Sequence, residues 1–345
     1  LTEREAGGYI MNHKLFTKTA ICAGIAGATL VVLSSTALAA PVGGTPPSFG
    51  GPMSSIFDSY HNLGSTNVRT TTPNGGTPSN HSNDTAEICV FCHTPHGGDN
   101  TAAVPIWNRQ LSDPNTYTRY SSLGTSTFDA TEAPVGSVTI ACLSCHDGTQ
   151  AIDSVINAPG SGGYDPAGAR IGTAFVGDDQ VNGQLDPTIV QNLGTDLSND
   201  HPVSMQYAGG GISTTNVNGP TNDPDFPAGA NPNPHPTSFT LNSMAAPTTA
   251  PITTLWWIER NDESLNNGSR DRVDVILYTR LESETGVAGG EQPFVECGSC
   301  HDPHNIDNPT FLRVSNGIPA SLAGDFPNAV SPNRGSALCL TCHIK

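Results

Sequence analysis

Eight of the nine cysteines occur in one repeated arrangement, Cys-x-x-Cys-His, in which a histidine directly follows the second cysteine. Two thiols at this spacing can add across the two vinyl groups of a haem, and the adjacent imidazole then reaches the iron. The arrangement therefore predicts four covalently bound haem c groups. The attachment residues would be Cys89, Cys92, Cys142, Cys145, Cys297, Cys300, Cys339 and Cys342. The proximal iron ligands would be His93, His146, His301 and His343.

Other uses of a Cys-x-x-Cys pair explain the sequence less well. A thioredoxin-like dithiol or a zinc site uses the same spacing, and a secreted chain can pair its cysteines as disulfides. None of these requires a histidine after the second cysteine in all four copies of the arrangement, which we call strings and number in chain order: Cys89–His93, Cys142–His146, Cys297–His301 and Cys339–His343. Haem attachment is therefore the prediction for every string.

Two further histidines, His96 and His304, each follow a proximal histidine by three residues, with a proline between them. Two ligands on opposite sides of one metal lie about 4 Å apart, and a three-residue peptide cannot pass around a haem plane to provide both. Each second histidine must therefore serve another haem, which predicts haems packed in close pairs.

The predicted distal ligands also include His201 and His61. Pro202 favours an extended backbone at His201 and would present its ring, and His61 follows a short helical pattern at residues 54–60. We assign no role to His81 or His235, which lie in polar, Pro-rich or Gly-rich stretches, and see no reason to prefer methionine ligands. The predicted distal ligands are His61, His96, His201 and His304.

Residues 11–39 have the features of a cleaved signal peptide. Lys14 and Lys18 precede an apolar run at residues 19–33, and Ala37-Leu38-Ala39 matches a small-residue cleavage site. Residues 1–10 are interpreted as upstream read-through. The apolar run is shorter than the roughly 20 residues that a membrane span needs, so we predict no membrane span. The expected location is outside the cell or at its surface, with the periplasm as the alternative.

The composition indicates how such a chain could fold. Hydrophobic residues make up 36% and charged residues 13%, and 37 glycines and 28 prolines leave little for a conventional core. We expect a mostly irregular chain with short helices and a few short strands, wrapped around a row of four haems that supply apolar surface. The formal net charge of −17 argues against nucleic acid as a partner.

The spacing of the strings divides the mature chain into three predicted parts. Residues 40–150 would form a first haem-pair module and residues 297–345 a second one. Residues 151–296 form an insert rich in Gly, Pro and Asn that supplies a distal histidine. Within it, β-prone residues 253–259 and 273–280 flank Asn267-Gly268, which predicts a hairpin in a largely irregular segment.

Several of these segments resemble the doubled Cys-x-x-Cys-His multihaem cytochromes, and among them the OmcE-type tetrahaem cytochromes that polymerise into extracellular filaments. The similar segments are residues 60–63, 89–97, 105–109, 142–148, 200–204 and 297–304. The resemblance implies two histidine ligands for every haem iron, parallel haem pairs joined by T-shaped contacts, and one distal histidine donated by a neighbouring subunit. Carried onto this chain, the expected donor is His61, and the partners are identical subunits.

The predicted function is therefore extracellular electron transfer along a conductive filament, with no enzymatic reaction. Other redox proteins or extracellular electron acceptors would be further partners. One alternative is a monomeric periplasmic tetrahaem shuttle, in which His61 binds iron in its own chain. Another is a multihaem reductase, which would need one iron with an open coordination position. The surplus of histidines argues against the reductase.

Overall fold

The computed structural model describes residues 56–67, 80–126, 128–160, 162–172, 175–216, 220–223, 226, 239–246, 252–260, 270, 274–305, 308–314 and 337–343. All of them lie in one compact unit, Gly50–Lys345. The predicted signal peptide, His235 and Asn267-Gly268 lie outside the described residues. In the described part of the chain, no helix has the length and apolar character needed to cross a membrane.

Short helices carry all four strings. The helices are η2 (Cys89–Phe91), α1 (Ser137–His146), α3 (Cys297–Cys300) and α4 (Ala337–Cys342). A helical turn places residues three apart on one face, so both thiols of a string point the same way. The remaining helices are η1 (Ile56–Asp58), η3 (Pro114–Thr116), η4 (Tyr120–Leu123), η5 (Tyr207–Gly209), α2 (Glu282–Thr285) and η6 (Pro309–Phe311).

The largest sheet is antiparallel, with strand order β7-β11-β10-β9-β8. Its strands are β7 (Met205–Gln206), β8 (Phe239–Ala245), β9 (Thr254–Arg260), β10 (Val275–Arg280) and β11 (Gln292–Val295). The other described strands form three two-stranded antiparallel sheets. They join β1 (His81–Ser82) to β4 (Phe175–Val176), β2 (Ser154–Asn157) to β3 (Tyr164–Arg170), and β5 (Gln180–Val181) to β6 (Gln184–Leu185).

The predicted hairpin is confirmed, because β9 and β10 pair with Trp256 opposite Leu277. The expectation that the insert is largely irregular missed the rest of the sheet, since all five of its strands lie within residues 151–296. The missed strands are short or lie close to proline-rich sequence. Strands of two to four residues form only where neighbouring strands supply their hydrogen bonds, which sequence patterning does not reveal.

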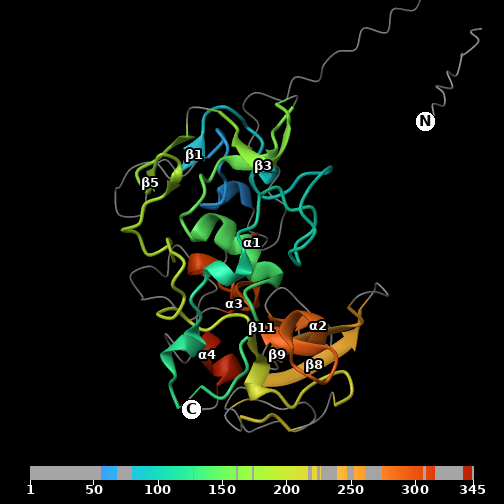
Figure 1. Ribbon diagram of the computed structural model, residues 1–345. Helices are drawn as coiled ribbons and strands as arrows, with labels where there is room; N and C mark the ends of the chain where they lie inside the picture. The colour runs from blue at the N-terminus through green and yellow to red at the C-terminus, as the bar shows by residue number, and fades with distance from the viewer. Residues whose placement is uncertain are drawn as a thin grey trace, which may run out of the picture. The chain divides into compact units, whose positions relative to one another are not determined.

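Each of the first, second and fourth strings contributes to an apolar cluster. Cys92 packs against two of them, one around Trp107 and Leu143 and one around Phe91 and Ile152. On the sheet, Leu338 and Cys342 of α4 pack against a cluster that contains Trp256. Helix α4 also contacts strand β9, and both are labelled in Figure 1. The strings thus lie beside apolar surface, which suits the hydrophobic faces of a haem.

Candidate functional site

The thiols of all four strings are unbridged: the eight string cysteines are free. They are exposed or half-buried, as attachment to a haem requires. The third string fits closely against the sheet, because a Cβ atom added at Gly298 would collide with the hydroxyl of Tyr278. A small residue is therefore needed between Cys297 and Cys300.

The strings form a row in sequence order. Burial, and then the nearby Cys145 thiol, raises the pKa of Cys92 to about 12, so the first two strings are neighbours. A hydrogen bond between the thiols of Cys142 and Cys297 joins the second string to the third, raising the pKa of Cys142 and lowering that of Cys297.

The fourth string completes this row. Burial, followed by the neighbouring Cys297 and Cys339 thiols, raises the pKa of Cys300 to about 11. Burial and the Cys300 thiol also raise the pKa of Cys342. Each string therefore lies near the next one along the chain.

Three proximal histidines are oriented by main-chain carbonyl groups. A carbonyl oxygen only accepts, so Nδ1 of each ring carries the proton in these contacts, which leaves Nε2 unprotonated and able to bind a metal. The Nδ1–O distances are 2.9 Å from His93 to Pro105, 2.8 Å from His146 to Gln191 and 2.7 Å from His301 to Thr310.

Two of the proximal rings face predicted distal rings. The centroids of His93 and His304 are 6.3 Å apart, and those of His61 and His146 are 6.2 Å apart. Bonds from a metal to imidazole nitrogen are about 2 Å long, so ring centroids on opposite sides of one metal lie roughly 6 Å apart. Both pairs therefore have the spacing that fits one haem iron between two imidazoles.

His61 is prepared to act as a neutral ligand. Burial, and then the nearby His146 ring, lowers its pKa to about 4, and a hydrogen bond to the backbone of Pro303 opposes this shift. The ring also stacks on Phe311, with centroids 4.5 Å apart and an interplanar angle of 3°. These contacts hold an unprotonated ring opposite His146 within the same chain.

The other two proximal histidines share a cavity with His201. The cavity has a volume of about 500 Å³, and its lining includes His201, His301 and His343 as well as cysteines of the third and fourth strings. Burial lowers the pKa of His301, and the nearby His201 acts in the same direction. Nδ1 of His201 lies 3.0 Å from the carbonyl oxygen of Pro202. One predicted distal histidine is thus available to two proximal ones.

His96 differs from the other predicted distal ligands. Its side chain is exposed, and none of the ring pairs within the described residues includes it. Its carbonyl oxygen accepts hydrogen bonds from Thr94 Oγ1 and Asn157 Nδ2, each at 3.1 Å. The backbone of His96 is therefore held in place while its ring faces solvent.

Arg109 has a structural role that we did not predict from the sequence. Its side chain is fully buried and directs its five N–H donors at neutral acceptors between 2.6 and 3.2 Å away. These acceptors are the hydroxyl of Ser144 and the carbonyls of Ser144, Ala151, Ile152 and Ser154. Arg109 thereby connects the segment after the first string to α1 and to the loop that follows it.

A second unpredicted network connects α1 to the third string. Thr139 Oγ1 donates to a carboxylate oxygen of Glu296 at 2.6 Å and accepts the backbone N–H of Cys297 at 3.0 Å. Arg280 forms a buried ion pair with Glu296 at 3.0 Å. Burial raises the pKa of Glu296, and Arg280 and the hydrogen bonds oppose that shift. No local sequence pattern relates residues this far apart.

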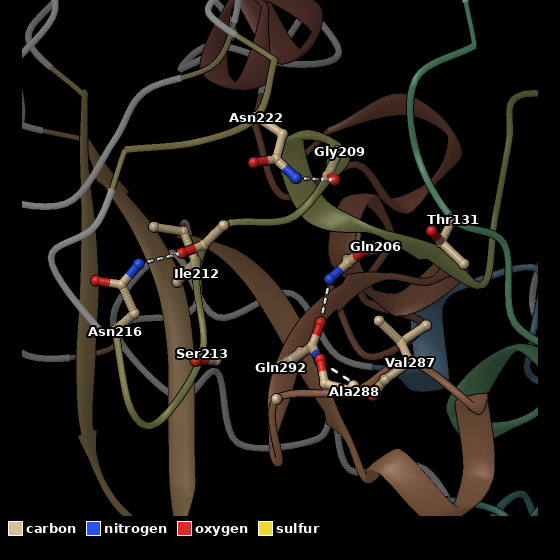
Figure 2. A pocket seen from close by; sticks show the side chains of 12 residues that line it. Thr131, Gln206, Gly209, Ile212, Ser213, Asn216, Asn222, Val287, Ala288 and Gln292 are labelled. Carbon is tan, nitrogen blue, oxygen red and sulfur yellow. Dashed lines mark hydrogen bonds between the residues drawn. The ribbon is translucent and has the colours of Figure 1, made fainter.

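A separate cavity of about 360 Å³ lies between β7, β11 and the loop that follows η5 (Figure 2). Figure 2 shows Asn222 donating to Gly209. Asn216 donates to the carbonyl oxygen of Gly211, so both amide side chains are engaged within the protein. Its described lining contains neither cysteine nor histidine. This cavity is distinct from the row of strings.

Comparison with known proteins supports the chemistry of the strings. A search of curated proteins found no match. Residues 287–345, which contain the third and fourth strings, match the doubled CXXCH motif family. CXXCH motifs indicate haem c binding, and their doubled arrangement supports a multihaem c-type cytochrome with a role in electron transport.

Proposed function

We propose that this chain binds four haem c groups and transfers electrons along them outside the cell, as the subunit of a filament. Each bound haem supplies a one-electron Fe(III)/Fe(II) couple. The observation that carries the proposal is the pair of ring contacts at 6.2 and 6.3 Å, each of which joins a proximal histidine to a predicted distal one. Two histidines for one iron favour electron transfer over reactions that need an open coordination position.

The first two strings have their ligands within the chain. His93 and His304 hold the iron of the first haem, and His146 and His61 hold that of the second. The resemblance to filament-forming cytochromes suggested His61 as the histidine donated to a neighbouring subunit. Its half-buried position opposite His146 supports ligation within its own chain instead.

The third and fourth strings indicate how subunits connect. His201 lines one cavity together with both His301 and His343. In this proposal His201 binds the iron at His301, and the iron at His343 takes its second ligand from a neighbouring subunit. The exposed His96 ring of a second copy is the donor in this proposal. A head-to-tail contact of this kind repeats from subunit to subunit and builds an open filament.

The test is to express the chain in cells that attach haem c and to collect material from the culture surface. Intact mass and a pyridine haemochrome assay should give four haems per chain. Absorption and electron paramagnetic resonance (EPR) spectra should show low-spin iron, and electron cryo-microscopy should show filaments with His96 on a neighbour's iron. Monodisperse particles would instead indicate a soluble shuttle, and a high-spin haem in the native protein would indicate a reductase.

A further inference from the structure

The Nδ1 nitrogen of His304 faces the side chain of an acidic residue. The other candidate ligand histidines with a described hydrogen-bond partner face backbone groups instead. His93, His146, His201 and His301 each place Nδ1 on a main-chain carbonyl, and His61 hydrogen-bonds to the backbone of Pro303. Nδ1 of His304 lies 3.5 Å from Oδ1 of Asp302. His304 is thus distinguished by a carboxylate neighbour.

Asp302 is held in place by neighbouring groups. Its side chain is 12% exposed, and Oδ1 accepts the backbone N–H of His304 at 3.0 Å. An Arg313 nitrogen lies 3.8 Å from Oδ2. The carboxyl group of Asp302 therefore faces His304 in a fixed position.

We propose that Asp302 is a positioning residue that lowers the reduction potential of the haem attached at Cys89 and Cys92. The inference rests on the proposed ligation of that iron by His93 and His304. A carboxylate behind a ligating histidine orients the ring and makes it a stronger electron donor. Negative charge close to the iron stabilises Fe(III) relative to Fe(II), so reduction becomes less favourable.

The chain contains its own neutral counterpart to Asp302. The two copies of the motif read Cys-His-Thr-Pro-His and Cys-His-Asp-Pro-His, so Thr94 occupies the equivalent position in the first copy. Thr94 is buried, and its hydroxyl donates to the carbonyl of His96 at 3.1 Å. The substitution Asp302→Thr therefore removes the charge and introduces a residue that the same backbone motif already accommodates.

The experiment compares the reduction potentials of the haem-loaded full chain with those of Asp302→Asn and Asp302→Thr by potentiometric titration. Second-sphere partners of metal ligands typically change function by about tenfold or more. We expect the Fe(III)/Fe(II) equilibrium of one haem to shift about tenfold toward Fe(II), which is a rise of ~59 mV for one electron. Asp186→Asn is the matched control, because Asp186 bonds Thr188 on an exposed loop.

EPR spectra and haem content distinguish a wrong role for Asp302 from a wrong assignment of the iron ligands. All four haems should stay low-spin in both Asp302 variants. Four unchanged potentials in low-spin protein would overturn the role of Asp302 while leaving the proposed ligation intact. A high-spin haem in both variants would also overturn it, since Asp302 would then only hold His304 in place. His304→Ala should leave one haem high-spin, and low-spin iron throughout that variant would refute the proposed ligation itself.

Discussion

Backbone carbonyl groups orient most of the candidate ligand histidines. A ring whose Nδ1 donates to a carbonyl is locked in the tautomer that offers Nε2 to a metal. His93, His146 and His301 have this arrangement although they lie on different elements. These carbonyl partners carry no net charge, whereas Asp302 places a carboxyl group beside His304.

Replacing His61 with alanine should convert one of the four haems from low spin to high spin. The ring lies 6.2 Å from His146, so its loss removes one axial ligand from the second haem in the proposed assignment. Absorption and EPR spectra of the assembled protein would measure the change. His81→Ala is the control, because His81 lies in β1 and is not among the predicted ligands. An unchanged spin state in the His61 variant would show that another residue supplies this ligand.

Replacing Gly298 with alanine should destabilise the fold around the third string. A Cβ atom there would collide with the Tyr278 hydroxyl, and overpacking of this kind costs roughly 1–3 kcal/mol. Denaturant unfolding of Gly298→Ala would give the loss in unfolding free energy. The double variant with Tyr278→Phe should recover part of it, since the nearest colliding atom is then absent and only the ring carbon Cζ, at 2.9 Å, still has to move. Equal stability of the single and double variants would contradict this explanation.

Among the elements, α1 and α3 form the centre of the row of strings. They are in contact, and Thr139 connects them by bonding both the Glu296 carboxylate and the Cys297 amide. Arg109 connects α1 to the first string in a similar way. Buried polar networks of this kind fix relative positions because an unpaired buried group is costly.

Thr139→Val should lower the unfolding free energy by about 2 kcal/mol. Valine has nearly the same shape, but it leaves the partly buried Cys297 amide without its acceptor and the buried Glu296 carboxylate without one donor. Denaturant unfolding monitored by circular dichroism would measure the loss. Thr188→Val, which changes an exposed hydroxyl bonded to Asp186, should lie within about 0.5 kcal/mol of the native value. Similar losses in both variants would argue against a special role for the Thr139 network.

At the scale of the whole molecule, each string lies near the next. The thiols of Cys142 and Cys297 are hydrogen-bonded, and the thiols of Cys92 and Cys145 and of Cys300 and Cys342 are close enough to interact electrostatically. Such a row could conduct within one chain or continue into the next. The exposed ring of His96 and the cavity at His343 are the two features on which the proposed continuation depends.

His96→Ala should abolish filaments while leaving a folded chain with four haems. The His96 ring is exposed and its backbone hydrogen bonds use only the carbonyl oxygen, so folding should be unaffected. Electron cryo-microscopy and light scattering would report assembly, and EPR should show one high-spin haem per chain. Filaments of normal length in this variant would assign subunit contact to another residue.

The sheet shows where prediction from sequence reached its limit. The hairpin of β9 and β10 was predicted because its β-branched and aromatic residues mark both strands. β7 and β11 are too short for such a signal, and they exist because each pairs with a neighbour, as Phe294 does with Gln206. Arg109 and Thr139 were missed for a related reason, since their partners are distant along the chain.

The sequence by itself determined the attachment chemistry, because two thiols and an imidazole within five residues act through local spacing that a single helical turn preserves. It also limited the distal ligands to a few histidines. Only the tertiary structure decided which rings face each other, placing His304 opposite His93 and His61 opposite His146. Partners separated by tens to hundreds of residues are brought together by packing, which depends on the whole chain.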